Sequence, residues 1–375
     1  MDERVLAERL ISADTSTLDG LRGAAGFVKG WLEARDIAVE EEHFEGLPIL
    51  LAAVGPKAGT APTVVLHGHL DVVPAHPEQF EPRVEGDRLI GRGAYDMKGA
   101  LACLMCALRD SADQDRVRVE FICVPDEESE DVENHSIDWL VRERPVKADF
   151  AITGEPTDLH IGVQAKGVLA VRVQIGGTAA HGSTPWLGDN AILKAHDVFR
   201  RIETMPFSRE SSDLFDRPSI NLARINGGDA FNKVPDRCEM DVDIRYLPGQ
   251  DPGAILAQIR ALPDTEIVKC STWPPAVVER SNTYVVALRE AIGGLTQGEA
   301  MSVGRDGASD AITFLDAGIP AVEFGPIGGG HHGPDEWVSI SSLTRYRRAL
   351  ADFIVSLPDR LAGDTGLRAV EGGLA

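Results

Sequence analysis

The order of apolar and polar positions predicts that the chain begins with alternating helices and strands. Leu21, Ala24 and Val28 are spaced by three or four residues, which places them on one face of a helix. Short apolar runs at 63–66 and 117–124 have the length and composition of buried strands. Helices that alternate with buried strands are typical of an α/β domain.

A different pattern occupies the middle of the chain. Extended segments at 168–175 and 219–225 flank an amphipathic helix over 191–202, and an alternating apolar run ends at Tyr246. Strands and helices in this order predict a small α+β sandwich whose sheet has an exposed edge. Such an edge could pair with a second copy of the chain.

The α/β pattern returns after Pro274, with a strand at 321–324 and a last helix at 343–357. A chain of 375 residues exceeds the size at which one core usually keeps growing, so two domains are expected. We predict that the first and last parts form one α/β domain, which the middle part interrupts. The three predicted parts are residues 1–166, 167–273 and 274–375.

The composition argues against two classes of partner. The formal net charge is −22 and Lys and Arg form no cluster, whereas binding to nucleic acid requires clustered cations. No apolar run is as long as a membrane span, so no membrane role is expected. The acidic amino-terminal segment lacks the basic and apolar parts of a secretion signal, which predicts a cytoplasmic protein.

The strongest local motif is HGHLDVVP, which follows the apolar run at 63–66. Alternate side chains of an extended segment point to the same face, so His67, His69 and Asp71 face the same way. A polar trio at the end of a buried strand is costly unless it meets water, a partner or a metal. A metal site and a hydrogen-bonded strand end both remain open. In a metal site, Asp71 could hold the second nitrogen of a ligand imidazole.

Four further motifs carry acids or imidazoles, and two of them have ordinary alternatives. The aspartate of GRGAYDMKGA could be a helix N-cap, and the acid run of VPDEESED could be a solvated loop. The other two motifs are ITGEPTD, at the end of another strand, and the Gly-rich GGGHHGPDEW. The side chains concerned are Asp96, Glu127, Glu128, Glu155, His331 and His332.

Together these motifs put carboxylates and imidazoles at the ends of several strands of one α/β sheet, where such sheets bind ligands. Carboxylates mixed with His suit Zn²⁺ or a similar divalent ion. Cys103 and Cys106 are spaced like a thiolate pair, but they lie in an apolar helical stretch, which favours buried thiols. The motifs therefore predict a divalent metal site made of oxygen and nitrogen ligands.

The motifs HGHLDVVP, GRGAYDMKG, PDEES, TGEPTD and HHGPDEW, in this order, resemble those of the M20 metallopeptidases. Within that family they are similar to the acetylornithine deacetylase and succinyl-diaminopimelate desuccinylase group, over nearly the whole chain. The resemblance implies a di-zinc aminopeptidase-like catalytic domain of α/β class. It also implies that the α+β sandwich is a lid and dimerisation domain, and that the protein is a homodimer.

The resemblance implies two divalent metal ions, most simply Zn²⁺, with Co²⁺ or Mn²⁺ as alternatives. The implied ligands are His69, Asp96 and Glu155 for one ion and Asp96, Glu128 and His332 for the other, so that Asp96 is the bridge. His67 and His331 match no ligand position and are left out of the predicted site. A cis peptide is also implied between Asp96 and Met97.

Further residues are implied in catalysis and in substrate binding. Glu127 is the implied general base, Asp71 the residue that orients His69, and His181 of AAHGSTPWLGDNA an oxyanion donor that can reach the neighbouring subunit's site. The implied contacts to substrate are Asn232, Arg245, Gly307 and Ser309. Arginine suits a substrate carboxylate because its planar fork forms two hydrogen bonds.

The implied reaction is hydrolysis of the amide bond of an N-acyl amino acid, of the acetylornithine or succinyl-diaminopimelate type, by a metal-bound water with Glu127 as base. The segment QAKGVLA differs from the Arg-Arg-Gly-Ser pattern of succinyl-diaminopimelate desuccinylases, so the acyl group stays open. A dipeptidase or carboxypeptidase with the same site is one alternative. A metal-dependent binding protein is another, although a binder has no need for a free base.

Overall fold

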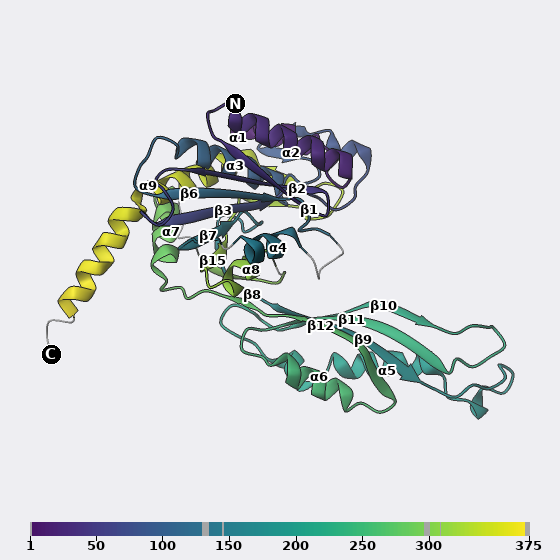
Figure 1. The fold of residues 1–375 in the computed structure, drawn as a ribbon. Helices are drawn as coiled ribbons and strands as arrows, with labels where there is room; N and C mark the ends of the chain where they lie inside the picture. The colour runs from purple at the N-terminus through teal and green to yellow at the C-terminus, as the bar shows by residue number, and fades with distance from the viewer. Residues whose placement is uncertain (1, 130–134, 145, 296–300, 308, 372–375) are drawn as a thin grey trace. The chain divides into compact units, whose positions relative to one another are not determined.

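The computed structural model of the chain describes residues 2–129, 135–144, 146–295, 301–307 and 309–371. The chain divides into two compact units (Figure 1). Unit 1 consists of Met1–Val163, Val278–Val303 and Ser309–Ala375, and unit 2 consists of Gln164–Val277 and Gly304–Ala308. Unit 2 is therefore inserted into the sequence of unit 1.

A mixed sheet with the strand order β1-β2-β6-β3-β7-β15-β8 forms the centre of unit 1. Its strands are β1 (Val39–Phe44), β2 (Leu47–Val54), β3 (Thr63–His69), β6 (Arg118–Val124), β7 (Phe150–Thr153), β8 (Ile161–Ala165) and β15 (Ala321–Glu323). The neighbours β6, β3, β7 and β15 run parallel, whereas β1, β2 and β8 pair antiparallel. Because parallel strands end at the same edge, the polar segments that follow β3, β6 and β7 meet there.

Helices cover both faces of this sheet (Figure 1). The helices of unit 1 are α1 (Glu3–Ile11), α2 (Leu18–Glu33), α3 (Lys98–Asp110), α4 (Ser136–Glu143), α7 (Thr283–Gly293), α8 (Ala311–Asp316) and α9 (Ile340–Glu371). On one face, α3 is buried from Lys98 to Leu108 because it packs between the sheet and helices α1 and α9. On the other face, Leu140 of α4 and Phe314 of α8 share a core with Val65 of β3.

A second, small sheet in unit 1 joins two loops that are far apart in the sequence. Its strand order is β16-β17-β5-β4, all antiparallel. The strands are β4 (Arg83–Glu85), β5 (Arg88–Ile90), β16 (Gly328–Gly329) and β17 (Trp337–Ser339). Trp337 pairs with Ile90, which places the segment after β5 beside the segment between β16 and β17.

Unit 2 contains an antiparallel sheet with the order β10-β11-β9-β12, packed against helices α5 and α6. Its elements are β9 (Gly167–Gly176), α5 (Ala191–Ile202), β10 (Ser219–Gly227), β11 (Arg237–Tyr246), α6 (Pro252–Arg260), β12 (Thr265–Trp273) and β13 (Ala276–Val277). Along β11 the core residues Met240, Val242 and Ile244 alternate with the more exposed Asp241 and Asp243. This alternation is the pattern of a sheet with one covered face.

The structure confirms the predicted α/β class, with a large mixed sheet in unit 1 and a smaller α+β arrangement in unit 2. The short strand β14 (Ser302–Arg305) pairs with β8, and Arg305 accepts a backbone hydrogen bond from Lys166. Cys103 and Cys106 are buried free thiols of α3. No helix of the described residues is both long and apolar enough to cross a membrane.

Candidate metal-dependent active site

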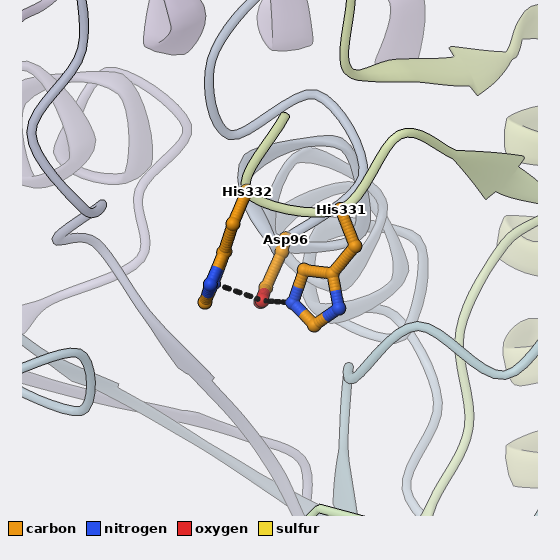
Figure 2. A group of neighbouring side chains, drawn as sticks. All are labelled: Asp96, His331 and His332. Atoms are coloured by element: carbon orange, nitrogen blue, oxygen red, sulfur yellow. Dashed lines mark hydrogen bonds and ion pairs between the residues drawn. The ribbon is translucent and has the colours of Figure 1, made fainter. Parts of the chain in front are cut away.

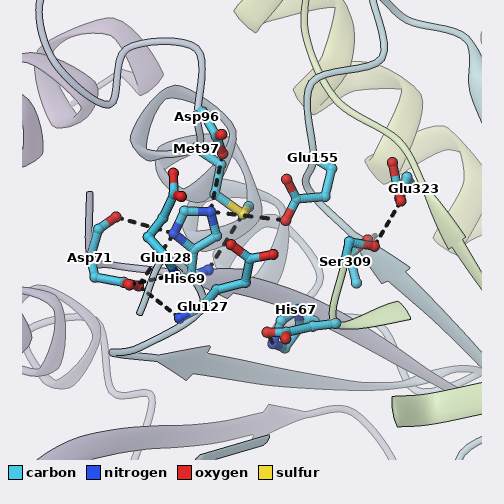
Figure 3. Close-up of polar contacts among 12 residues, drawn as sticks. His67, His69, Asp71, Asp96, Met97, Glu127, Glu128, Glu155, Ser309 and Glu323 are labelled. Carbon is cyan, nitrogen blue, oxygen red and sulfur yellow. Dashed lines mark hydrogen bonds and ion pairs between the residues drawn. The ribbon is translucent and has the colours of Figure 1, made fainter. Parts of the chain in front are cut away.

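The predicted ligands of unit 1 come together at the carboxyl ends of the parallel strands (Figure 3). His69 is the last residue of β3, Glu128 follows β6, and Glu155 follows β7. One atom of each of His69, Asp96 and Glu155 lies within 4.8 Å of the other two. The parallel topology thus gathers side chains that are up to 86 positions apart in the sequence.

His69 is held from both ring nitrogens. Its Nε2 lies 3.1 Å from Asp96 Oδ1 and 3.9 Å from Glu155 Oε1. Its Nδ1 lies 3.1 Å from the backbone oxygen of Asp71 and 3.4 Å from the Oδ1 atom of the same residue. A nitrogen that donates to an oxygen of Asp71 leaves Nε2 to face Asp96 and Glu155, which is the orientation that a metal ligand needs.

The carboxylate of Asp71 holds the segment after β6. Asp71 Oδ2 accepts a hydrogen bond of 2.8 Å from the backbone N–H of Glu128, and Oδ1 accepts one of 3.2 Å from that of Glu127. The first acid of this run, Asp126, is buried and accepts hydrogen bonds from the backbone N–H and the hydroxyl of Ser136. These three acids are therefore not part of a freely solvated loop, which was the alternative reading of the motif.

Asp96 lies at the centre of the second group of side chains (Figure 2). Its Oδ2 forms a hydrogen bond with His331 Nε2 and lies 3.4 Å from His332 Nε2. His332 Nε2 also lies 2.8 Å from Glu128 Oε1. Asp96 thus contacts His69 with one oxygen and the histidine pair with the other, as a bridging carboxylate would.

The alternative reading of Asp96 as a helix N-cap is wrong. Helix α3 begins at Lys98, its cap position is Met97, and no side chain caps it. The carboxylate of Asp96 contacts the three imidazoles described above instead. The peptide bond between Asp96 and Met97 is cis, as the resemblance implied.

The site holds more carboxylates than imidazoles, and burial together with this excess shifts the pKa values of its acids. Burial and the charge of Glu155 raise the pKa of the Glu127 carboxyl well above its usual value. Burial and the charge of Asp96 do the same to the pKa of Glu155. Burial alone would raise the pKa of Asp96, but hydrogen bonds from the imidazoles, first that of His331, hold it well below the usual value. Hydrogen bonds to Asp96 and Glu128 raise the pKa of His332 to about 10.

These residues fit divalent metal ions. Glu155 Oε1 is buried and has no hydrogen-bond partner among the described residues, although a buried carboxylate oxygen without a partner is costly. A cation close to His69, Asp96 and Glu155 would satisfy this oxygen and offset the repulsion between the acids. Nitrogen and oxygen donors of this kind suit zinc and similar divalent ions.

His67 does not join the metal-ligand groups, although it precedes His69 by two positions on the same strand face. It is fully buried, and its Nε2 lies 3.2 Å from Asp310 Oδ2. Its ring packs edge-on against Phe314 of α8.

The other predicted residues are distributed over both units. In unit 1, the Ser309 hydroxyl donates to Glu323 Oε1 at 2.7 Å. In unit 2, the backbone N–H and the hydroxyl of Ser183 lie 3.1 Å and 2.7 Å from His181 Nδ1, and the other ring nitrogen, Nε2, has no hydrogen-bond partner among the described residues. Arg245 in β11 bonds Asp243 through Nε only, as far as the described residues show.

Asn232 and Gly307 also belong to unit 2. Both are exposed, and the Asn232 backbone oxygen accepts a hydrogen bond of 2.7 Å from the backbone N–H of Gly182. Asn232 is therefore a neighbour of His181. The roles of these residues in substrate binding stay predictions.

Three residues of the site were not assigned a role from the sequence. His331 bonds Asp96, although it matched no ligand position. Arg92 and Glu336 form a buried ion pair beside Asp96 and His332. The only sequence signal for His331 is its position beside His332 in GGGHH. No sequence spacing links Arg92 to Glu336, which lies 244 positions away.

Comparison with known proteins places the chain in a family. The model of peptidase family M20/M25/M40 matches residues 65–356. A putative succinyl-diaminopimelate desuccinylase of Mycobacterium tuberculosis (strain CDC 1551 / Oshkosh) is 32% identical over 300 residues, 77% of this chain and 81% of that protein. An acetylornithine deacetylase of Proteus mirabilis (strain HI4320) is 30% identical over 260 residues, 66% of each chain.

Solved structures show the same fold at lower identity. An M20 family metallo-carboxypeptidase from Sulfolobus solfataricus has a TM-score of 0.76 and 20% identity, over 94% of this chain and 99% of that one. An aminopeptidase from Bacillus cereus ATCC 10987 has a TM-score of 0.78 and 20% identity, over 94% and 97%. From the family match, the relatives and the gathered ligands, we conclude that the chain belongs to peptidase family M20/M25/M40 and is a metal-dependent amidohydrolase.

Proposed function

We propose that the chain removes the acyl group of an N-acyl amino acid by hydrolysing the amide bond, with Glu127 as general base. The observation that carries this proposal is the position of Glu127. Its carboxylate lies within 4.8 Å of ligand atoms of His69 and Glu128, and it has no hydrogen-bond partner among the described residues. A carboxylate beside the predicted ligands that is not itself engaged is available to accept a proton.

The proposed metal ligands form two sets that share Asp96. His69, Asp96 and Glu155 would hold one divalent ion, and Asp96, Glu128 and His332 the other. Zn²⁺ is the proposed ion, because a set of imidazoles and carboxylates without thiolate suits it. When bound, such ions act as Lewis acids that polarise a carbonyl and acidify water.

The residues of the chain supply the proton transfers. Glu127 takes a proton from the attacking water while the oxygen of this water bonds to the carbonyl carbon of the substrate. Glu127 then gives this proton to the nitrogen as the C–N bond breaks, which releases a carboxylate and a free amine. Asp71 fixes the backbone of Glu127 and Glu128, so the base keeps its place beside the ligands.

Substrate recognition is proposed for residues of both units. His181, whose Nδ1 faces Ser183, would donate from Nε2 to the developing oxyanion. Arg245 would bind the substrate carboxylate, with Asn232, Gly307 and Ser309 as further contacts. The relatives support an N-acyl amino acid as substrate, since two of them are named as a desuccinylase and a deacetylase.

The test is release of free amine from a panel of N-acetyl amino acids, N-succinyl amino acids and dipeptides. We expect turnover of at least one N-acyl amino acid, with a higher kcat/KM than any dipeptide. Glu127→Gln keeps the shape of the side chain but cannot accept the proton, so kcat should fall by about 100- to 10,000-fold. Metal content, measured on the same preparations, should be unchanged.

Glu120→Gln is the matched control, because Glu120 lies on β6, the strand that precedes Glu127, and pairs with Arg118 away from the predicted ligands. Its turnover should equal that of the wild type. A higher kcat/KM for dipeptides than for every N-acyl amino acid would mean that the chain is a peptidase of the same family and not a deacylase. Normal turnover in Glu127→Gln with full metal content would show that another group is the base.

A further inference from the structure

A buried ion pair links the two loops that carry Asp96 and His332. Arg92 Nη1 and Glu336 Oε2 are 2.5 Å apart, and the two side chains are only 4% and 0% exposed. Arg92 lies between β5 and Asp96, and Glu336 lies between His332 and β17. The pair therefore stands at the end of the small sheet, where β5 and β17 bring these loops together.

Glu336 is bonded to the loop of Asp96. Its Oε1 accepts hydrogen bonds from the backbone N–H groups of Tyr95, at 2.9 Å, and of Asp96 itself, at 3.1 Å. The backbone oxygen of Glu336 also accepts the N–H of Gly91 at 2.9 Å. One carboxylate thus fixes the backbone of the predicted bridging ligand.

Arg92 extends the same contact to the loop of His332. While Nη1 bonds Glu336, Nη2 donates to the backbone oxygen of His332 at 3.0 Å. Only a planar guanidinium presents two donors in this fixed arrangement. The backbones of Asp96 and His332 are therefore joined through two side chains, neither of which is a predicted metal ligand.

Burying two charges is costly, and a hydrophobic pair of the same volume is often no less stable. Fold stability alone is thus a weak reason for this pair. A metal site, in contrast, needs its ligands held within about 0.5 Å of the working geometry by packed and hydrogen-bonded neighbours. The bonds of Arg92 and Glu336 end on the backbones of two predicted ligands, which is what such a neighbour must do.

We propose that Arg92 and Glu336 are positioning residues that set the separation of Asp96 and His332 and so determine the affinity of the site for divalent metal ions. The inference rests on the proposed function only in that both use the predicted ligands. The two residues touch neither substrate nor the attacking water in this account. Their effect reaches the reaction through the ligands alone.

Two conservative variants test this role. Arg92→Lys keeps a positive charge for Glu336 but cannot bond Glu336 and the His332 carbonyl in the same fixed geometry. Glu336→Gln keeps an oxygen for the N–H groups of Tyr95 and Asp96 but loses the charge that binds Arg92. We expect each variant to bind Zn²⁺ about 10- to 100-fold more weakly than the wild type, in competition with a chelator. The visible absorption of bound Co²⁺ should also change.

The matched controls are Arg347→Lys and Glu3→Gln. Arg347 Nη1 and Glu3 Oε2 are 2.6 Å apart in a second largely buried pair of unit 1, which joins α9 to α1 and contacts no predicted ligand. These variants should lower the melting temperature of the metal-free protein but keep the Zn²⁺ affinity and the Co²⁺ spectrum of the wild type.

The inference is overturned if Arg92→Lys and Glu336→Gln bind Zn²⁺ as tightly as the wild type, whatever their melting temperatures. It is also overturned if all four variants lose affinity in proportion to their loss of stability, because the pair would then act only on the fold. Absence of Zn²⁺ binding in the wild type is a separate result. That result would remove the proposed metal site itself, and this inference with it.

Discussion

At the scale of single residues, Asp96 explains how the site is held together. Its two oxygens contact imidazoles from two distant segments of the chain, His69 at the end of β3 and the pair His331 and His332 before β17. Burial first, and then the charges of neighbouring carboxylates, raise the pKa values of Glu127 and Glu155, so acids this close to one another need positive charge nearby. The proposed bridging role of Asp96 leads to a prediction of how many metal ions the chain holds.

Asp96→Asn should remove both metal ions, because the amide lacks the charge that either ion needs from the bridge. His332→Ala should remove only one ion, since His69, Asp96 and Glu155 remain. The measurement is the number of zinc atoms per chain by elemental analysis after dialysis. Asp113→Asn, at an exposed position, serves as the control and should match the wild type. Equal zinc content in Asp96→Asn and His332→Ala would contradict the shared ligand.

Residue types and motif order predict a group of side chains that the structure does bring together, but they do not predict Arg92 and Glu336, which contact the backbones of two members of this group. HGHLD and PDEES end apolar runs, so the position of their acids and imidazoles at a sheet edge follows from the strand pattern. Arg92 and Glu336 carry no such signal. Their roles depend on a contact across 244 positions, and neither residue stands at a strand end of the central sheet.

At the scale of elements, the central strands were predictable and the edges were not. The apolar runs of β3 and β6 predict buried strands. The sequence of β1, VEEEHF, has no such run, and this strand is not predicted. Its acids are exposed or half-buried because β1 is an edge strand that pairs only with β2. The two- and three-residue strands of the small sheet are likewise too short to show a period.

Close packing of strand ends makes Gly325 a test of the central sheet. Gly325 follows β15, and a Cβ atom there would lie 2.3 Å from the backbone oxygen of Glu155. Gly325→Ala should therefore destabilise the protein by about 1–3 kcal/mol and displace Glu155. Urea unfolding gives the free energy, and zinc titration reports the displaced ligand.

Gly23→Ala is the control for this change. Gly23 is an exposed position of α2 where a Cβ would meet nothing within 4 Å. Alanine favours the helix, so this variant should be more stable than the wild type by about 0.5–1 kcal/mol. A Gly325→Ala protein as stable as the wild type would mean that the ends of β7 and β15 are not packed as described.

The contact between α1 and α9 predicts a dependence of stability on acid. Burial by itself raises the pKa of Glu3, but hydrogen bonds from Thr344 and Arg347 outweigh it and place the pKa below the ordinary value of 4.5. A carboxyl with a lowered pKa in the folded state stabilises the fold above its unfolded pKa and loses this effect as the pH falls. Glu3→Gln should thus cost about 1–2 kcal/mol at pH 7, and less as the pH falls below 4.5.

Unfolding of the metal-free protein in urea at pH 7 and at pH 4 measures this difference. Glu8→Gln is the matched control on the same helix, since the pair of Glu8 with Arg4 is more exposed. It should change the stability little at either pH. If the loss of unfolding free energy in Glu3→Gln, relative to the wild type, became larger at pH 4 than at pH 7, the pKa of Glu3 would be raised in the folded protein and not lowered.

At the scale of the whole molecule, unit 2 interrupts unit 1, and the short segment Gly304–Ala308 groups with unit 2 instead of with the flanking sequence of unit 1. The predicted three-part division assigns this segment, as part of 274–375, to the α/β domain. Lys166 of unit 2 holds this segment, because its backbone N–H donates to the backbone oxygen of Arg305 and its Nζ lies 2.8 Å from Asp306 Oδ1. No sequence period reveals these contacts. The assignment of unit 2 as lid and dimerisation domain, the homodimer and the cytoplasmic location stay predictions.

We propose that five side chains brought together by the fold of unit 1 hold a pair of divalent ions; they are His69, Asp96, Glu128, Glu155 and His332. A crystal structure of the zinc-loaded protein, with anomalous data recorded at the zinc edge, tests it most directly. We expect two strong peaks near the Asp96 carboxylate, one beside His69 and Glu155 and one beside Glu128 and His332. Zinc peaks at other residues, or no peak at Asp96, would contradict it.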